Sequence, residues 1–127
     1  MKKVLIVDDV RGWREQHLLI LRELLGEEAT FDMASSAQEG YDLVYNNLNE
    51  PYDLIVTDLQ MESDFAPKYA GEWLVEQIKL LSAYATTRIV LISATYNIRL
   101  IAEGLNVRYI SKSVASQFPQ SYLDIVI

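Results

Sequence analysis

The chain of 127 residues carries 18 acidic and 11 basic side chains, for a formal net charge of −7. This acidic balance argues against direct binding to nucleic acid, and the lack of cysteine excludes disulfides and thiolate metal sites. Half of the residues are hydrophobic, enough for one core, so we expect a single domain over residues 1–127. No apolar run has the length of a membrane span, and the first one is too short for a signal peptide. We therefore expect a cytoplasmic protein that does not bind membranes.

Short apolar runs alternate with amphipathic stretches, the pattern of strands that alternate with helices. In chain order the runs predict strands over residues 4–7, 29–34, 53–57, 87–94 and 107–111. The first helix is expected over residues 10–25 with Gly26 as its stop, and the second follows a cap at Ser35 or Ser36. After a polar segment over residues 60–70, Trp73 to Leu81 mark the third helix. A fourth helix is predicted over residues 96–104 and ends at Gly104, and a last one over residues 116–127 has Pro119 in its first turn.

Strands that are apolar on both faces and alternate with helices predict an α/β fold, a doubly wound parallel sheet with helices on both faces. In such sheets, ligands bind at the carboxyl ends of the strands. Asp8 and Asp9 follow the first predicted strand, and Asp58 follows the third. If these strands are neighbours, the carboxylates converge, and two such charges about 4 Å apart repel by roughly 4 kcal/mol at an effective dielectric constant near 20. Oxygen ligands of this kind suit a hard cation, above all Mg²⁺. Taken singly, Asp9 is better explained as a helix cap and Asp58 as a loop acid after a strand.

Two further polar residues stand at the same edge of the predicted sheet. Ser93 ends the fourth strand, and Lys112 comes just after the fifth. Each alone is ordinary, a strand-end serine and a solvated lysine. Together with the three carboxylates they form a set that handles a phosphoryl group: a carboxylate attacks phosphorus, while a metal, an ammonium and a hydroxyl stabilise the phosphoryl oxygens.

The order and spacing of these motifs resemble the receiver domain of two-component response regulators, over essentially the full length of the chain. The segment "LIVDDV" resembles the acid pair after the first strand, and "DLIVTDLQM" resembles the phosphoacceptor segment after the third. The segment "LISA" resembles the hydroxyl–alanine step of the fourth strand, and "YISKS" the aromatic residue and lysine of the fifth. The resemblance implies a flavodoxin-like five-stranded sheet of order 2-1-3-4-5.

The resemblance also implies partners and roles. The chain would be a signalling domain, not an enzyme beyond slow self-dephosphorylation, that receives a phosphoryl group from a sensor histidine kinase or a phosphotransfer protein. It would act on an output domain or a downstream protein, or form a homodimer. The implied roles are Asp58 as phosphoacceptor, Asp8, Asp9, Asp58 and the backbone carbonyl of Gln60 as Mg²⁺ ligands, Ser93 and Lys112 as contacts of the phosphoryl oxygens, Tyr109 as switch residue, and Gln60 and Thr95 at positions that tune hydrolysis.

Three features depart from the family pattern. The loop after Asp58 is five residues longer than usual: Glu62 stands where a proline is common, and the expected glycine, Gly71, comes late. This loop, which also holds Asp64 and Pro67, is equally open to neutral drift or to a role in partner choice. Ser113 replaces the proline that usually follows the lysine, so the preceding bond is open to either isomer. The last helix is short, which suits either a stand-alone receiver or a piece of a longer regulator.

The remaining notable residues are assigned to structure or to the partner surface. His17, the one histidine, falls on the apolar stripe of the first helix, and Trp73 is expected to pack against the long loop. Ile98, Arg99, Ile101 and Arg108 are placed on the face of the fourth helix and fifth strand, where the family commonly binds its output. The alternative function is a degenerate receiver-like module that binds partners without phosphorylation, for which the long loop and Ser113 leave room.

Overall fold

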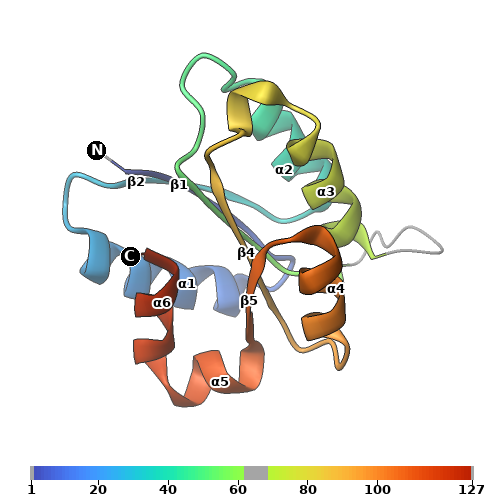
Figure 1. Ribbon diagram of the computed structural model, residues 1–127. Coiled ribbons are helices and arrows are strands. Elements are labelled where there is room, and N and C mark those ends of the chain that lie inside the picture. Colours follow the sequence, from blue (N-terminus) through green and yellow to red (C-terminus); the bar gives the residue numbers. More distant parts are fainter. Residues whose placement is uncertain (1, 62–68, 127) are drawn as a thin grey trace.

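Strands and helices alternate along the chain in the computed structural model, which describes residues 2–61 and 69–126 (Figure 1). The strands are β1 (Lys3–Val7), β2 (Thr30–Ala34), β3 (Leu54–Thr57), β4 (Arg88–Ser93) and β5 (Arg108–Ser111). The α-helices are α1 (Arg11–Leu25), α2 (Ala37–Tyr45), α3 (Ala70–Lys79), α4 (Ile98–Leu105), α5 (Lys112–Gln117) and α6 (Leu123–Val126), joined by the short 3₁₀ helices η1 (Ser82–Tyr84) and η2 (Pro119–Tyr122). The predicted strands are thus all present.

The strands of the described residues form one parallel five-stranded sheet in the order β2-β1-β3-β4-β5, which confirms the predicted α/β fold. β1 lies between β2 and β3, with Val7 opposite Ala34 on one side and Thr57 on the other. The carboxyl ends of β1 and β3 are therefore direct neighbours, as the convergence of the three acids requires.

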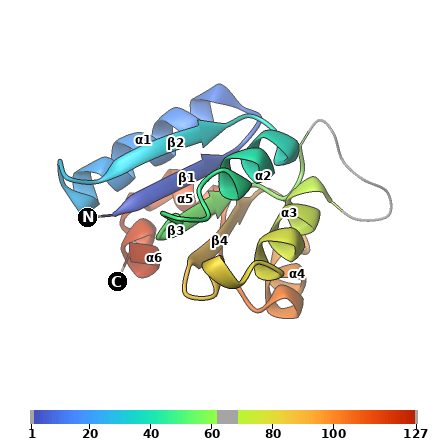
Figure 2. The same cartoon turned by 90° about the horizontal axis from the view of Figure 1, so that it is seen from above.

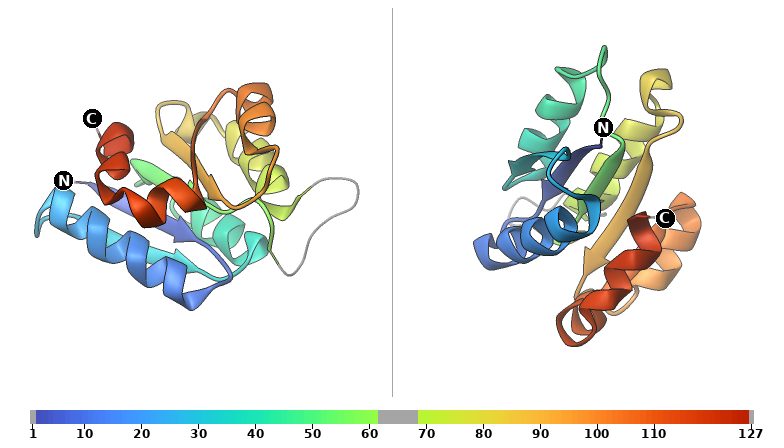
Figure 3. Two further views of the ribbon diagram at one scale, coloured as in Figure 1. Left: turned by 90° about the horizontal axis from the view of Figure 1, so that it is seen from below. Right: turned by 90° about the vertical axis from the view of Figure 1, so that its left-hand side faces the viewer.

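Helices cover both faces of the sheet, as Figures 2 and 3 show. Helices α1, α5 and α6 lie on one face, and α2, α3 and α4 lie on the other. Because side chains alternate along a strand, neighbouring residues of β1 enter different cores. Leu5 and Val7 pack with the α2–α3–α4 side, whereas Val4 and Ile6 pack with the α1–α5–α6 side. Among the described residues, none of the helices combines the length and the apolar character needed to cross a bilayer.

Helix α4 ends differently from the sequence prediction. Gly104 is an ordinary helical residue, and the helix continues to Leu105. Asn106 then adopts the left-handed conformation, with φ of 58° and ψ of 51°, and its N–H donates to the carbonyls of Ala102 and Glu103. Asparagine is one of the few residues besides glycine that visits this region readily, so the prediction chose the wrong one of two plausible stops.

The carboxyl-terminal region is also divided differently from the prediction. Helix α5 begins at Lys112, directly after β5, where the Ser111 Oγ accepts the N–H of Val114 at 3.3 Å. The helix stops at Gln117, and Pro119 opens η2 before α6 follows. Proline cannot continue a helix because it has no N–H and its ring clashes with the preceding turn. One predicted helix over residues 116–127 is therefore three short ones, and the start at Lys112 was not anticipated.

The starts of two other helices refine the prediction. Ser36 is the N-cap of α2, and its Oγ accepts the N–H of Glu39 at 3.1 Å. The Glu39 carboxylate accepts the N–H of Ser35 at 2.6 Å, so both candidate serines take part. Helix α3 begins at Ala70, which puts Gly71 in its first turn instead of before the helix.

Candidate functional site

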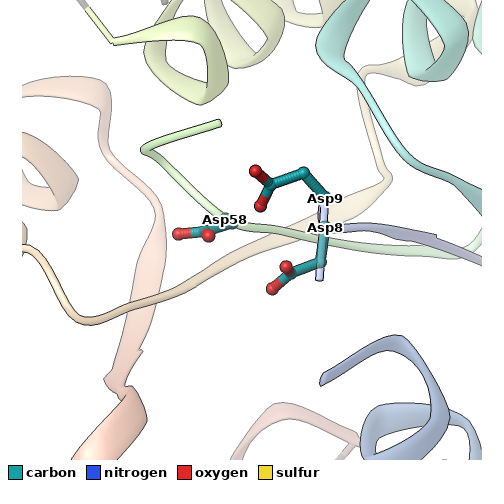
Figure 4. Close-up of side chains that lie close together, drawn as sticks. All are labelled: Asp8, Asp9 and Asp58. Carbon is teal, nitrogen blue, oxygen red and sulfur yellow. The ribbon is translucent and has the colours of Figure 1, made fainter. Parts of the chain in front are cut away.

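The three acids lie together at the carboxyl ends of β1 and β3 (Figure 4). The strand ladder continues one residue past each strand: Asp8 N–H donates to the carbonyl of Ala34 at 3.1 Å, and Asp58 N–H donates to that of Val7 at 2.9 Å. Asp8, Asp9 and Asp58 each offer a carboxylate oxygen, and these oxygens lie within 4.8 Å of one another. Asp8 and Asp58 are buried, whereas Asp9 is partly exposed. Asp9 does not cap the first helix, since Val10 is the N-cap of α1.

Lys112, the residue after β5, joins two of the acids. Its Nζ lies 3.0 Å from Asp8 Oδ2 and 3.0 Å from Asp58 Oδ2, with the side chain only 10% exposed. The Trp13 ring packs beside the same ammonium, with its centroid 5.0 Å from Nζ. Because Lys112 is the first residue of α5, the Ser111 cap fixes the point at which the lysine leaves the backbone. The alternative that Lys112 is an ordinary solvated lysine is therefore wrong, because the side chain is buried and paired with two acids.

The pKa values of Asp8 and Lys112 are both raised, for different reasons. Burial raises the pKa of Asp8, helped by the negative charge of Asp58, although the Val10 N–H and Lys112 act against it. Burial acts to lower the pKa of Lys112, but the carboxylates of Asp58 and Asp8 outweigh it and raise that pKa. The two carboxylates thus hold Lys112 in its ammonium form, while burial disfavours the ionised form of Asp8.

The hydrogen bonds of the two buried acids differ. Asp58 Oδ1 accepts the N–H of Leu59 at 2.7 Å, and its Oδ2 accepts a bond from Lys112 at 3.0 Å. Asp8 Oδ1 accepts the N–H of Val10 at 2.9 Å, and Asp8 Oδ2 is paired with Lys112 Nζ at 3.0 Å. Three carboxylates this close together, with one ammonium beside two of them, keep an excess of negative charge that suits a hard divalent cation such as Mg²⁺.

Three other predicted residues lie around the acids at different depths. Ser93, at the end of β4, is buried, and its hydroxyl is paired with Thr95. Tyr109, on the edge strand β5, is 40% exposed. Gln60 is exposed, two residues after Asp58. Glu62, Asp64 and Pro67, the residues assigned to the long loop, lie outside the described residues.

Gly71 is notable in the sequence, which gives no structural reason for a glycine there. The packing around Asp58 gives that reason. A Cβ at Gly71 would coincide with the carbonyl oxygen of Asp58 and lie 2.7 Å from the Cα of Leu59. The Gly71 N–H donates to the carbonyl of Leu59 at 2.9 Å. The first turn of α3 therefore rests directly on the backbone of the Asp58 segment, and only a residue without a side chain allows this approach.

A second feature absent from the sequence analysis is a buried chain of side chains behind Lys112. His17 is 1% exposed, and its Nδ1 lies 2.6 Å from the hydroxyl of Tyr122, which confirms its place in the core. Its ring also packs near Trp13, with centroids 5.6 Å apart. Burial, with help from the charge of Lys112, lowers the pKa of His17 to about 4. His17 is thus a neutral histidine at ordinary pH.

The surface of the fourth helix and fifth strand contains partly different residues from those predicted. Ile98 is buried in the core at 5% exposure, and Ile101 packs against the same core, so the prediction that they face outward is wrong. The exposed residues of this region include Arg99, which is paired with exposed Glu103 at 3.2 Å, and Leu100, Arg108, Tyr96 and Tyr109. On an amphipathic helix the apolar positions that recur every three or four residues face the core, which explains the error.

No protein-family model and no curated protein sequence matches the chain. Solved structures do match. The chemotaxis protein CheY4 of Vibrio cholerae shares 18% identity, with a TM-score of 0.74 over 100% of this chain and 99% of that one. The Mn²⁺-bound form of the response regulator Rcp1 shares 16%, with a TM-score of 0.74 over 100% and 98%. The BeF₃-activated DrrB receiver domain shares 16%, with a TM-score of 0.70 over 98% and 95%. Many of the similar structures are CheY-like receiver domains, so the chain has the receiver-domain fold, which is what identities this low can show.

Proposed function

We propose that residues 1–127 form a phosphoryl-accepting receiver domain of a two-component system, and that Asp58 is the phosphoacceptor. The observation that carries the proposal is the environment of the Asp58 carboxylate. One oxygen accepts the N–H of Leu59, the other is paired with the buried ammonium of Lys112, and two further acids stand within metal-binding distance. A cluster with this composition at the carboxyl ends of parallel strands suits phosphoryl transfer.

In the proposed reaction, an Asp58 carboxylate oxygen attacks the phosphorus of a phosphohistidine on a sensor kinase or phosphotransfer protein. The P–N bond breaks, its electron pair stays with the imidazole nitrogen, and Asp58 becomes an acyl phosphate. The Lys112 ammonium and the Ser93 hydroxyl donate to the phosphoryl oxygens. Asp8, Asp9, Asp58 and the Gln60 carbonyl are the proposed Mg²⁺ ligands; when bound, the metal supplies positive charge to the same oxygens.

The output is proposed to be a change of surface. We assign Tyr109 as the switch residue, since it is a partly exposed aromatic on the edge strand nearest α4. The exposed Arg99 and Leu100 of α4 are the proposed contact surface for an output domain, a downstream protein or a second copy of the chain, whereas Arg108 on β5 is bonded to the carbonyl of Asp124. On this proposal the protein is a cytoplasmic signalling domain, with no enzymatic turnover beyond slow loss of its own phosphoryl group. The burial of Lys112 between two acids favours it over a degenerate module that never binds phosphate.

The first experiment tests the acceptor. Incubation with acetyl phosphate and Mg²⁺ should add the mass of one phosphoryl group, which hydroxylamine should remove because acyl phosphates react with it. Intact-protein mass spectrometry should show no gain for Asp58→Asn. An equal gain in parent and Asp58→Asn would refute Asp58 as the acceptor.

A second experiment tests the metal through a built-in reporter. Because the Trp13 ring contacts the ammonium that pairs with Asp8 and Asp58, Mg²⁺ binding should change Trp13 fluorescence. The saturable change should remain in Trp73→Phe, which removes the other tryptophan, and vanish in Trp73→Phe combined with Asp9→Asn. A signal that survives in the latter would place the metal elsewhere.

A third experiment tests the switch. With beryllofluoride and Mg²⁺, which mimic the acyl phosphate, NMR of labelled tyrosines should report a more buried Tyr109. Ser93→Ala should weaken that shift while leaving Asp58 able to accept a phosphoryl group. An unchanged Tyr109 environment in the parent protein would mean that the domain signals in another way.

A further inference from the structure

The Ser93 hydroxyl is already occupied in this structure. Its Oγ lies 2.9 Å from Thr95 Oγ1, and the two hydroxyls share a hydrogen bond. The Thr95 backbone N–H donates to the same Ser93 Oγ at 3.3 Å. Among the described residues, the side-chain hydrogen bonds of the Ser93 hydroxyl go to Thr95 and not to Asp58. Ser93 Oγ is thus bonded to Thr95 in this structure. In the proposed function the same hydroxyl donates to a phosphoryl oxygen on Asp58.

Both hydroxyls are buried, so their bond is costly to break. Ser93 is 1% exposed and Thr95 is 8% exposed. A buried hydroxyl that loses its partner keeps its desolvation cost and gains nothing in return. Thr95 is also β-branched, so its side chain has few rotamers in which to look for another partner. Turning Ser93 toward a phosphoryl oxygen therefore leaves Thr95 Oγ1 to be satisfied by movement of the chain itself.

Residue 95 is also connected to helix α4. The Thr95 carbonyl accepts the N–H of Ile98, the first residue of α4, at 3.2 Å. Ile98 is itself 5% exposed and packed in the core. A movement of Thr95 therefore reaches the start of α4 through one hydrogen bond and one packed side chain. This places residue 95 between the site hydroxyl and the helix that carries the exposed Arg99 and Leu100.

We propose that Thr95 is a positioning residue that acts as a latch: its hydroxyl holds Ser93 in the resting state and opposes activation until Ser93 finds a phosphoryl oxygen. The proposal rests on the proposed function and deepens it. It concerns the equilibrium between resting and activated states, and is separate from hydrolysis of the acyl phosphate. A ligand at Asp58 shifts this equilibrium only by the difference between its contacts in the two states, and the Ser93–Thr95 bond belongs to the resting state.

The test measures the concentration of beryllofluoride that half-saturates the protein in excess Mg²⁺, since this mimic is not hydrolysed. Thr95→Val removes the hydroxyl and keeps the shape, so it should lower that concentration about fivefold, the value of one neutral hydrogen bond. Thr95→Ser keeps a hydroxyl and should restore the parent value. Thr87→Val is the matched control: it removes a hydroxyl that donates to the carbonyl of Tyr52 at the far end of β4, and should change stability without changing the half-saturating concentration.

A double-mutant cycle completes the experiment. In the Ser93→Ala background the latch has nothing to hold, so Thr95→Val should have no further effect. The proposal is overturned if Thr95→Val leaves the half-saturating concentration unchanged, if Thr95→Ser behaves like Thr95→Val, or if the effect persists in Ser93→Ala. A parent protein that binds beryllofluoride with Thr95→Val unchanged refutes the latch alone. A parent that neither binds it nor is phosphorylated at Asp58 refutes the proposed function, and the latch falls with it.

Discussion

The two ends of the sheet both carry charged residues, but these residues have different partners. At the amino end, Lys3 Nζ donates to the carbonyl of Glu50 at 2.8 Å and to Asn47 Oδ1 at 2.5 Å. Arg88 donates to the carbonyl of Ile125 at 3.0 Å, and Arg108 donates to that of Asp124. In each of these bonds the cation donates to a neutral oxygen, mostly of the backbone, and so fastens a loop or the carboxyl-terminal segment to the sheet.

At the carboxyl end, charges face charges. Lys112 lies between Asp8 and Asp58, and the resulting group is almost wholly buried. Such a group gains little stability from its ion pairs, because desolvation cancels most of their attraction. The difference teaches that charges which bind the backbone hold a fold together, whereas buried charges that face one another add little stability and suit an ionic ligand. The following substitutions set the two ends against each other.

The largest effect is expected from removing the central cation. Lys112→Met leaves two buried carboxylates unpaired and should lower the free energy of unfolding by about 3–5 kcal/mol. Lys3→Met, at the amino end, loses bonds to neutral oxygens and should cost about 1–2 kcal/mol. Urea unfolding at neutral pH measures both. Mg²⁺ should restore part of the loss in Lys112→Met and none in Lys3→Met; equal costs and equal Mg²⁺ responses would erase the contrast between the two ends.

The next effect depends on pH and comes from His17, buried behind Lys112. Its pKa is about 4 in the folded protein, against 6.5 for an unperturbed histidine. Between these two pH values the unfolded chain therefore binds more protons than the folded protein, so protonation of His17 favours unfolding. The contribution of neutral His17 to the free energy of unfolding is complete above pH 6.5 and is lost as the pH falls toward 4. A shift of this size corresponds to about 3 kcal/mol.

His17→Gln removes this titration, and no other histidine can replace it because the chain has only one. Between pH 7 and pH 4.5, the parent should lose about 2–3 kcal/mol more stability than the variant. Urea unfolding at the two pH values gives the difference. Parallel losses in the two proteins would show that carboxylates, not His17, govern acid sensitivity.

A smaller effect should come from the contact between α3 and the Asp58 segment. Gly71→Ala places a methyl group onto the backbone carbonyl of Asp58, so the helix or the acceptor must move, at a cost of about 2 kcal/mol. Gly104→Ala is the control, because nothing lies within 4 Å of its added Cβ and alanine favours a helix. It should stabilise by about 0.5–1 kcal/mol. Thermal unfolding should therefore shift in opposite directions, and a neutral Gly71→Ala would contradict the close approach.

Much of the fold was predictable because each strand is a short apolar run with its own boundary signals. Boundaries failed where two local signals competed. Gly104 and Asn106 both suit a helix end, and the sequence alone gives no measure of which one the packing of α4 selects. Pro119 suits a first turn, but whether the helix before it starts at Lys112 depends on the Ser111 cap.

The site was predictable for a different reason: the carboxyl ends of parallel strands must meet, so residues at those ends converge whatever lies between them. Asp8, Asp9, Asp58 and Lys112 follow from this rule. Contacts between the helices and the strand ends do not follow from this rule, since they depend on how distant segments pack. The Trp13 ring on Lys112 and the approach of Gly71 to Asp58 are of this kind.

The smallest expected effect is also the sharpest comparison, because one substitution should have opposite signs at the two ends. Asp8 has a pKa raised by burial, so the folded state favours its neutral form. Neutral, nearly isosteric Asp8→Asn should therefore stabilise the metal-free protein, while Lys112 keeps its pairing with Asp58. At the amino end, Asp53 Oδ2 accepts the backbone N–H of Lys3 at 2.9 Å, and Asp53→Asn weakens that bond and should destabilise by a few tenths to 1 kcal/mol.

Urea unfolding without metal compares Asp8→Asn and Asp53→Asn with the parent protein. The same measurement with Mg²⁺ should show stabilisation of the parent and Asp53→Asn but not of Asp8→Asn. If Asp8→Asn destabilised the metal-free protein as Asp53→Asn does, the Asp8 carboxylate would be a fastening group like those at the amino end, and the view that the carboxyl end gives up stability for an ionic ligand would be wrong.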